Sequence, residues 1–195
     1  SVPILSGLTT LEPAVFLNCR SLETVELPPG LTSIGNSAFQ STGLKSITLP
    51  GTLTSLGDSA FSSCPDLESV RFEGGLDTIG DSTFRGCVAF ASTGIDSIDL
   101  SGVREIGSGA FADCSQLTRV VFPKSIRAIG DGAFARCFRM AAAVFEGDAP
   151  TVGKNVFTQG PDFKVIVSET SKGFTVPRWN GRKVSLPGAE IVIRN

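Results

Sequence analysis

The most informative stretch of the sequence is Ile34-Gly35-Asn36-Ser37-Ala38-Phe39. Similar stretches recur along the chain, and each ends in a phenylalanine that lies 22 to 27 residues after the previous one. These phenylalanines are Phe16, Phe39, Phe61, Phe84, Phe111, Phe134 and Phe157. In the first copy, Glu12 replaces the glycine. Seven copies at a nearly constant interval indicate a repeat protein in which each copy forms one structural unit.

The rest of each repeat contains a cysteine position and an alternating apolar stretch. The cysteine follows the phenylalanine by three residues, and two copies carry Thr42 and Gly160 at this position instead. The cysteines are Cys19, Cys64, Cys87, Cys114 and Cys137. The stretch Leu117-x-x-Val120-x-Phe122 shows the alternation that predicts a half-buried strand.

Two further patterns concern the connections between strands. The segment Asp/Asn-Ser/Gly-Ala-Phe predicts about one helical turn, with Asp58, Asp81 or Asp131 as its N-cap. The interval of 27 residues between Phe84 and Phe111 predicts an extra loop at residues 87–90 that leaves the stack intact.

One repeat of this size cannot bury its own apolar face, but stacked repeats can, because each strand pairs in parallel with the next at about 4.8 Å. We therefore expect an α/β solenoid, a right-handed coil of about seven repeats of about 23 residues. A parallel β-sheet forms its concave side and short helical turns form the other side. The cysteines then lie in an internal ladder whose side chains project in parallel, so we expect them to be reduced and buried.

The pattern Cys-x-x-Leu-x-x-Ile-x-Leu-Pro, followed by Leu-x-x-Ile-Gly-x-x-Ala-Phe-x-x-Cys, resembles the BspA-like (Treponema-type) leucine-rich repeat family. The resemblance covers residues 1–168, and it implies a secreted or cell-surface bacterial protein, some relatives being adhesins. Residues 169–195 resemble the closing segment of such proteins, so we expect a C-terminal cap that includes Trp179. The alternative is that Trp179 is the centre of a binding site. Because Val2 and Ile4 match strand positions of the next repeat, we expect a fragment that starts within a repeat.

The concave face is the candidate binding surface. Outward positions of the strands are polar in the N-terminal repeats and become apolar at Val121, Val144 and Ile166, with Ala142 beside them. Such a contiguous row is unusual on a solvated sheet. Either residues 169–195 cover the row, or the row is open and binds a partner with Arg71, Asp99 and Arg119 as its polar rim.

Composition excludes several classes of function. The formal charge is −2 and no apolar run is long enough for a membrane span, so we expect neither nucleic-acid binding nor membrane insertion. The chain has no histidine, which removes imidazole bases and histidine metal ligands. Cysteines that occur once per repeat do not form a Cys-x-x-Cys zinc motif, and turn capping explains Asp58, Asp81 and Asp131 better than a calcium site does. We expect no enzyme, no metal and no cofactor.

The sequence therefore predicts a non-enzymatic recognition or adhesion module, located extracellularly or on the cell surface. Its partner would be a protein or a glycan bound through the concave sheet. The alternative is a structural spacer that displays another domain and has no ligand of its own.

Overall fold

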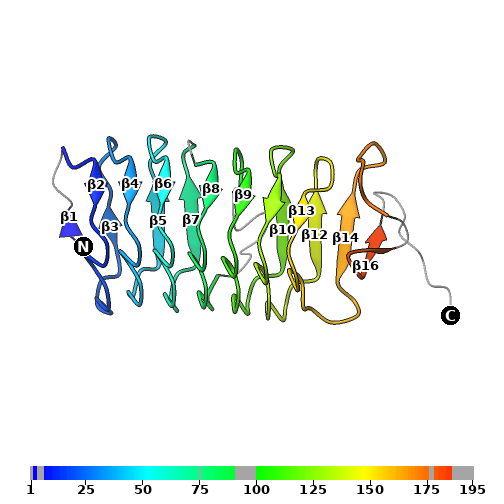
Figure 1. The fold of residues 1–195 in the computed structure, drawn as a ribbon. Coiled ribbons are helices and arrows are strands. Elements are labelled where there is room, and N and C mark those ends of the chain that lie inside the picture. Colours follow the sequence, from blue (N-terminus) through cyan, green and yellow to red (C-terminus); the bar gives the residue numbers. More distant parts are fainter. Residues whose placement is uncertain (1, 4–6, 75, 91–99, 176–177, 186–195) are drawn as a thin grey trace.

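The structure is a computed structural model, and it describes all residues except 1, 4–6, 75, 91–99, 176–177 and 186–195. The chain winds into successive coils that stack side by side, with the two termini at opposite ends of the stack (Figure 1). This is the parallel solenoid expected from the repeats.

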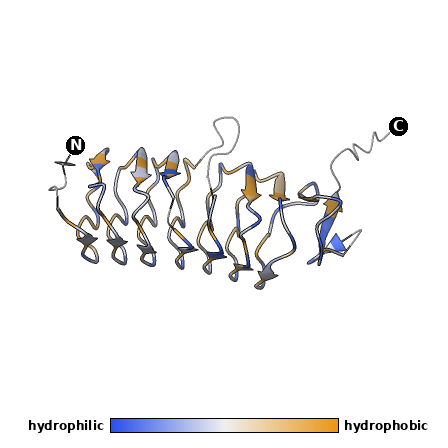
Figure 2. Ribbon diagram, turned by 90° about the horizontal axis from the view of Figure 1, so that it is seen from above, coloured by the Kyte–Doolittle hydropathy of each residue, from blue (hydrophilic) through white to orange (hydrophobic). Residues whose placement is uncertain are grey.

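The described strands lie on two sides of the stack and form two layers when the molecule is seen from above (Figure 2). One side is formed by β1 (Val2–Pro3), β3 (Val25–Glu26), β5 (Ser46–Leu49), β7 (Ser69–Phe72), β10 (Arg119–Phe122), β12 (Ala142–Phe145), β14 (Lys164–Val167) and β16 (Arg182–Ser185). The other side is formed by β2 (Thr10–Leu11), β4 (Ser33–Ile34), β6 (Ser55–Leu56), β8 (Thr78–Ile79), β9 (Glu105–Ile106), β11 (Ala128–Ile129) and β13 (Thr151–Val152).

Neighbouring strands pair in parallel at equivalent positions of successive repeats. Val120 pairs with Ala143, and Ala143 pairs with Val165. Side chains alternate in direction along a strand, so every inward position of one coil lies beside the inward position of the next. The outward positions form columns in the same way, which is what makes a surface row possible.

Stacked phenylalanine rings run through the interior of the solenoid. Successive rings from Phe16 to Phe157 have their centroids 5.1 to 5.7 Å apart. The stack continues across the long interval, where Phe84 and Phe111 lie 5.3 Å apart. The prediction of an extra loop at residues 87–90 is wrong, because Cys87 and Phe90 are fully buried in the core. Phe90 occupies the repeat position of Leu117, so the additional residues follow it.

The predicted helical turns are wrong, since the described residues contain no helix. The second residue of each turn has a left-handed backbone, with φ of 56° at Ser37 and 60° at Gly132. This conformation interrupts an α-helix and directs alternate N–H groups to the next coil. The N–H groups of Ser37 and Phe39 accordingly donate to the carbonyls of Asp58 and Ala60, at 2.9 and 2.8 Å.

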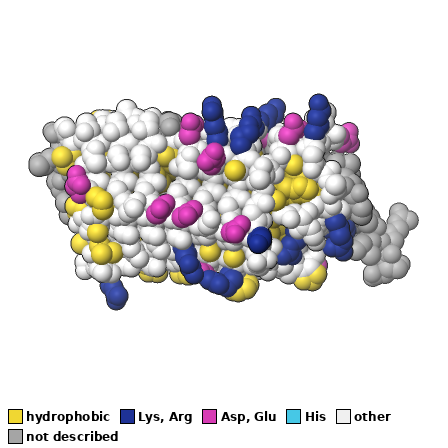
Figure 3. All heavy atoms as spheres, in the orientation of Figure 1, with side chains coloured by type: hydrophobic (Ala, Val, Ile, Leu, Met, Phe, Trp, Pro, Cys, Tyr) yellow, Lys and Arg dark blue, Asp and Glu magenta, His cyan; other side chains and the backbone are white. Residues whose placement is uncertain are grey.

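The aspartates of these turns cap the next coil instead of their own. Asp58 Oδ1 accepts the backbone N–H of Asp81 at 2.9 Å, and Asp131 Oδ1 accepts that of Lys154 at 2.7 Å. Acidic side chains are visible along the length of the stack in Figure 3. These aspartates therefore link neighbouring coils and do not serve as N-caps. The link requires that the backbones of the two coils lie close together at the turn. A Cβ on Gly130 would lie 2.6 Å from the backbone nitrogen of Ser108, so this position requires glycine.

The cysteines are all free, as expected, and four of them are fully buried. The expectation of burial is wrong for Cys19, which is exposed because it belongs to the first coil of the stack. Each buried thiol donates to the phenylalanine carbonyl of the preceding coil at 3.0 to 3.2 Å. These thiol and carbonyl pairs are Cys64 with Phe39, Cys87 with Phe61, Cys114 with Phe84, and Cys137 with Phe111.

Candidate binding face

Five of the seven candidate residues come together on one surface. We call the solvent-facing side of β5, β7, β10, β12, β14 and β16 the long-strand face. On it Val121, Val144 and Ile166 are direct neighbours in register, and we call these three the apolar row. Arg119 and Ala142 are paired alongside the row. The three apolar side chains are half-buried, which is the exposure of a sheet surface and not of a core.

The described part of the C-terminal segment extends the row and does not cover it. Strand β16 pairs in parallel with β14, so Ser185 continues the line of Ile166 and Lys183 continues the line of Lys164. We call Arg119, Lys164 and Lys183 the basic column, and Ala142 lies within it between Arg119 and Lys164. Among the described residues, no segment covers the row.

Two candidate residues are not joined to this surface by the described structure. Arg71 is exposed on β7, where it pairs with Thr48 in a separate two-stranded sheet. Asp99 lies outside the described residues. Of the two described residues of the expected polar rim, Arg119 is next to the apolar row and Arg71 is not.

The basic column carries three exposed cations for which the described residues provide no ion-pair partner. Among the described residues, four other cations form ion pairs with carboxylates of neighbouring coils. Lys45 lies 2.7 Å from Glu23, and Arg136 lies 2.5 Å from Asp113. The hydrogen bond from Arg136 lowers the pKa of Asp113, which keeps this carboxylate charged. Positive charge is therefore left uncompensated beside the apolar row.

Sequence reasoning missed Lys183 because the segment around it has no repeat pattern. It lies in a hairpin formed by β16 and β15 (Arg178–Trp179), which pair antiparallel. The turn residues Asn180 and Gly181 both have positive φ, at 50° and 77°, as the tightest hairpin turns require. The signal in the sequence is this Asn-Gly pair, followed by the buried Val184 between outward neighbours.

Trp179 is packed inside this end of the stack. It is 8% exposed, and its ring lies 5.5 Å from Phe145 and 4.8 Å from Phe174. A side chain with this exposure has little surface left for a partner. The interpretation of Trp179 as the centre of a binding site is therefore wrong.

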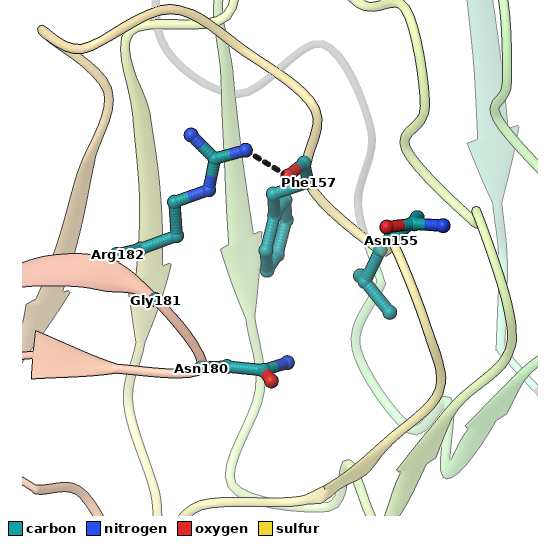
Figure 4. A pocket seen from close by; sticks show the side chains of 6 residues that line it. Asn155, Phe157, Asn180, Gly181 and Arg182 are labelled. Atoms are coloured by element: carbon teal, nitrogen blue, oxygen red, sulfur yellow. Dashed lines mark hydrogen bonds between the residues drawn. The ribbon is translucent and has the colours of Figure 1, made fainter.

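A small pocket lies beside the hairpin, and Arg182 is one of the residues that line it (Figure 4). Its volume is about 290 Å³, and it is lined by Asn155, Val156, Phe157, Asn180, Gly181 and Arg182. The guanidinium donates to the carbonyl of Phe157 and, at 2.7 Å, to that of Gln159. Through these two hydrogen bonds, Arg182 joins the hairpin to the last coil.

Chemistry beyond contact is not supported by the described residues. They hold no group of three or more histidine, cysteine, aspartate or glutamate side chains placed to bind a metal ion. They also contain no helix that could cross a membrane. What the long-strand face offers is apolar surface, positive charge and a fixed spacing between coils.

The fold and its repeating coils define a leucine-rich-repeat solenoid. The family model for the BspA type leucine rich repeat region matches residues 1–89 and 88–171, with six copies. The chain belongs to this family, as the sequence pattern predicted. None of the curated proteins compared with the chain matches it.

Solved structures show the same fold. A leucine-rich repeat protein from Bacteroides ovatus has a TM-score of 0.63 and 21% identity, covering 94% of this chain and 54% of that one. The leucine-rich repeat protein of T. pallidum has a TM-score of 0.54 and 24% identity, covering 74% and 69%. A leucine rich cell surface protein from Faecalibacterium prausnitzii has a TM-score of 0.51 and 20% identity, covering 96% and 60%. The chain thus spans 54% and 60% of the lengths of the first and third of these structures.

The family and the fold indicate the general class of function. The chain is a repeat domain of the kind found in BspA-like proteins, and this family and fold are generally non-enzymatic. Leucine-rich-repeat domains generally mediate protein interactions.

Proposed function

We propose that this domain is a recognition or adhesion module that binds a protein or a glycan through the C-terminal half of the long-strand face. The observation that carries the proposal is the apolar row, whose three side chains lie on adjacent strands without a covering segment among the described residues. Water-exposed apolar side chains in one contiguous patch mark interaction surfaces. The extracellular or cell-surface location belongs to the same proposal, and the similarity to a cell surface protein of F. prausnitzii supports it.

We further propose that residues 169–195 close the C-terminal end of the stack. Trp179 and Val184 are buried there, and Arg182 satisfies carbonyl groups of the last coil. A terminal unit of this kind keeps the end of a solenoid from exposing its core. The repeats and the closing segment then act as one binding unit, because the sheet runs from β10 to β16 without interruption.

The test compares two variants that carry the same new charge on opposite sides of one coil. Val144→Glu places a carboxylate in the apolar row, while Thr151→Glu places one at an exposed position of β13. Both variants and the wild type are applied to a panel of immobilised purified extracellular proteins and glycans. We expect at least one ligand that binds the wild type and Thr151→Glu equally and binds Val144→Glu at least about tenfold more weakly.

The competing function is a spacer without a ligand. It would be supported if no member of the panel binds, or if every observed interaction is unchanged in Val144→Glu. Unfolding midpoints of the two variants provide the control for folding, because surface substitutions on either sheet are expected to change stability by less than about 0.5 kcal/mol.

A further inference from the structure

We propose that the partner of the long-strand face presents an amphipathic α-helix with acidic side chains along one flank, lying along the axis of the solenoid. This inference rests on the proposed function and specifies its ligand. Three features of the face carry it: the spacing of the apolar row, the position of the basic column, and the small side chain of Ala142.

The spacing of the apolar row matches a helix. Val121, Val144 and Ile166 lie on successive strands, which are about 4.8 Å apart. Helix side chains three and four residues apart are separated by about 5–6 Å and form one stripe. An extended segment in the same direction repeats its side chains on one face every 6.6–6.8 Å, roughly. It would lose register with the row after two coils, whereas a helical stripe stays close to it.

The basic column determines where the partner carries its charge. Arg119, Lys164 and Lys183 are exposed beside the row, without an ion-pair partner among the described residues. Arg119 and Lys164 are separated by two coils, about 10 Å, with Ala142 between them. Because Ala142 is small, both long side chains can converge on one carboxylate above it. Lys183 provides a second anion position on the hairpin.

The other edge of the row fixes the orientation of the partner. Glu146 directly follows β12, shares the outward direction of Ala142 and Val144, and is exposed. The face therefore has the basic column on one side of the apolar row, whereas the other side carries the Glu146 carboxylate together with Lys124 and Arg127. A helix that is acidic on only one flank fits best with the acidic flank over the basic column, which contains no carboxylate. The reverse orientation places its carboxylates next to Glu146.

The experiment uses synthetic helix-forming peptides of about 15 residues, long enough to hold helical structure. One peptide has a leucine stripe flanked by glutamates. A second has lysines at the glutamate positions, and a third has the acidic composition in scrambled order. Binding to the whole chain is measured by fluorescence anisotropy at low and high salt. Vesicles containing phosphatidylserine serve as a competing anionic ligand.

We expect the acidic helix to bind at least about tenfold more tightly than the lysine peptide, and to weaken as salt is raised. The scrambled peptide should bind as weakly as the lysine peptide. Lys164→Glu should lower the affinity for the acidic helix about tenfold, and Val144→Glu should abolish binding. The matched control is Lys154→Glu, which makes the same charge change at an exposed lysine after β13, and it should bind like the wild type.

Three outcomes overturn the inference. Equal binding of the acidic and lysine peptides, both sensitive to Val144→Glu, would reject the acidic partner and leave the proposed face intact. Equal binding of the scrambled peptide would reject the helix. Absence of peptide binding, with or without binding to the vesicles, would reject a helical protein partner, and the panel experiment would then decide the proposed function on its own.

Discussion

The buried cysteines of this solenoid act as hydrogen-bond donors, in addition to packing as small apolar side chains. Each buried thiol donates to a phenylalanine carbonyl of the preceding coil, in a core where no water is available to replace it. In the last coils other side chains are the donors: the Gln159 amide donates to the carbonyl of Phe134 at 2.6 Å, and Arg182 donates to that of Phe157. Where Thr42 replaces the cysteine, its hydroxyl donates to Phe39. Thr42 thus bonds a carbonyl of its own coil, and Gly160 has no side-chain donor, so in that coil the neighbouring Gln159 makes the bond to the preceding coil.

We predict that Cys114→Ser is more stable than Cys114→Ala. Both variants leave a small gap in the core, but serine retains the side-chain donor to the Phe84 carbonyl, whereas alanine leaves this group with the backbone N–H of Cys87 as its one donor. The expected difference in the free energy of unfolding is about 1 kcal/mol, measured by urea denaturation. If packing alone determined this position, the buried hydroxyl would be a cost, and Cys114→Ala would be the more stable variant.

The buried thiols also predict how stability depends on alkaline pH. Burial raises the pKa of Cys137 to about 12 and holds the pKa values of Cys87 and Cys114 well above their ordinary range. Hydrogen bonds from Cys87 and Thr42 instead lower the pKa of Cys64 to about 7.

In the unfolded chain the thiols lose their protons near pH 9.0, whereas folded Cys137 keeps its proton until about pH 12. Between these values the folded state binds more protons, so the free energy of unfolding should decrease as pH rises. The pKa of Cys64 is shifted in the opposite direction, so this thiol does not contribute to the decrease. The chain has no tyrosine, so no phenol contributes. Urea midpoints should fall less steeply for Cys137→Ser than for Cys19→Ser, and identical slopes would contradict the prediction.

At the scale of the elements, the strands were predictable and the turns were not. Alternation around Val120 fixes which residues face inward, and the repeat interval fixes the neighbouring strand. The turn depends on a left-handed residue that is serine at Ser37 and glycine at Gly132. Serine has no strong preference for this conformation, so the sequence suggests a helical turn until the next coil is present to accept its hydrogen bonds.

The candidate site, too, could be predicted from the sequence only in part. The apolar row follows from strand register, but whether residues 169–195 cover it depends on the path of a segment without repeats. Strand β16 adds Lys183 to the basic column because the hairpin pairs with β14. No periodicity in the sequence encodes that pairing. Lys183 could therefore not be identified from the sequence as a neighbour of Lys164.

Arg182 is predicted to attach this hairpin to the solenoid. Arg182→Met retains the aliphatic stem and removes the guanidinium that bonds the carbonyls of Phe157 and Gln159. The exposed neighbour Lys183 is the matched control as Lys183→Met. Hydrogen exchange of the backbone in β15 and β16 should be about tenfold faster or more in Arg182→Met, and unchanged in the control. Equal exchange in the two variants would show that packing of Trp179 alone holds the hairpin.

The whole molecule combines a nearly neutral chain with an uneven distribution of charge. The formal charge is −2, yet the basic column has no counterpart among the neighbouring outward positions of β10, β12, β14 and β16. Four cations at other described positions form ion pairs between coils, such as Arg104 with Asp77 at 3.7 Å. A repeat sequence can place several cations in one column by changing single outward residues without altering its core.

The core is continuous from one end of the stack to the other, which determines how the molecule should unfold. Buried residues form one cluster from Leu11 to Val184, and Phe90 lies 5.8 Å from Phe84 and 6.3 Å from Phe111 across the longest repeat. Solenoids are stabilised by interfaces between neighbouring coils, so an unbroken series of interfaces couples distant repeats.

Trp179 is the chain's single tryptophan, and it reports on the C-terminal end alone, whereas far-ultraviolet circular dichroism reports on all coils. We predict coincident urea transitions by the two signals. Phe61→Ala removes a fully buried ring in the N-terminal half and should cost about 3–5 kcal/mol. It should lower the midpoint of Trp179 fluorescence as much as that of the circular dichroism, because the end of the stack cannot remain folded without its supporting coils. A fluorescence midpoint that stays at the wild-type value while the circular dichroism shifts would show two independent halves separated at the long repeat.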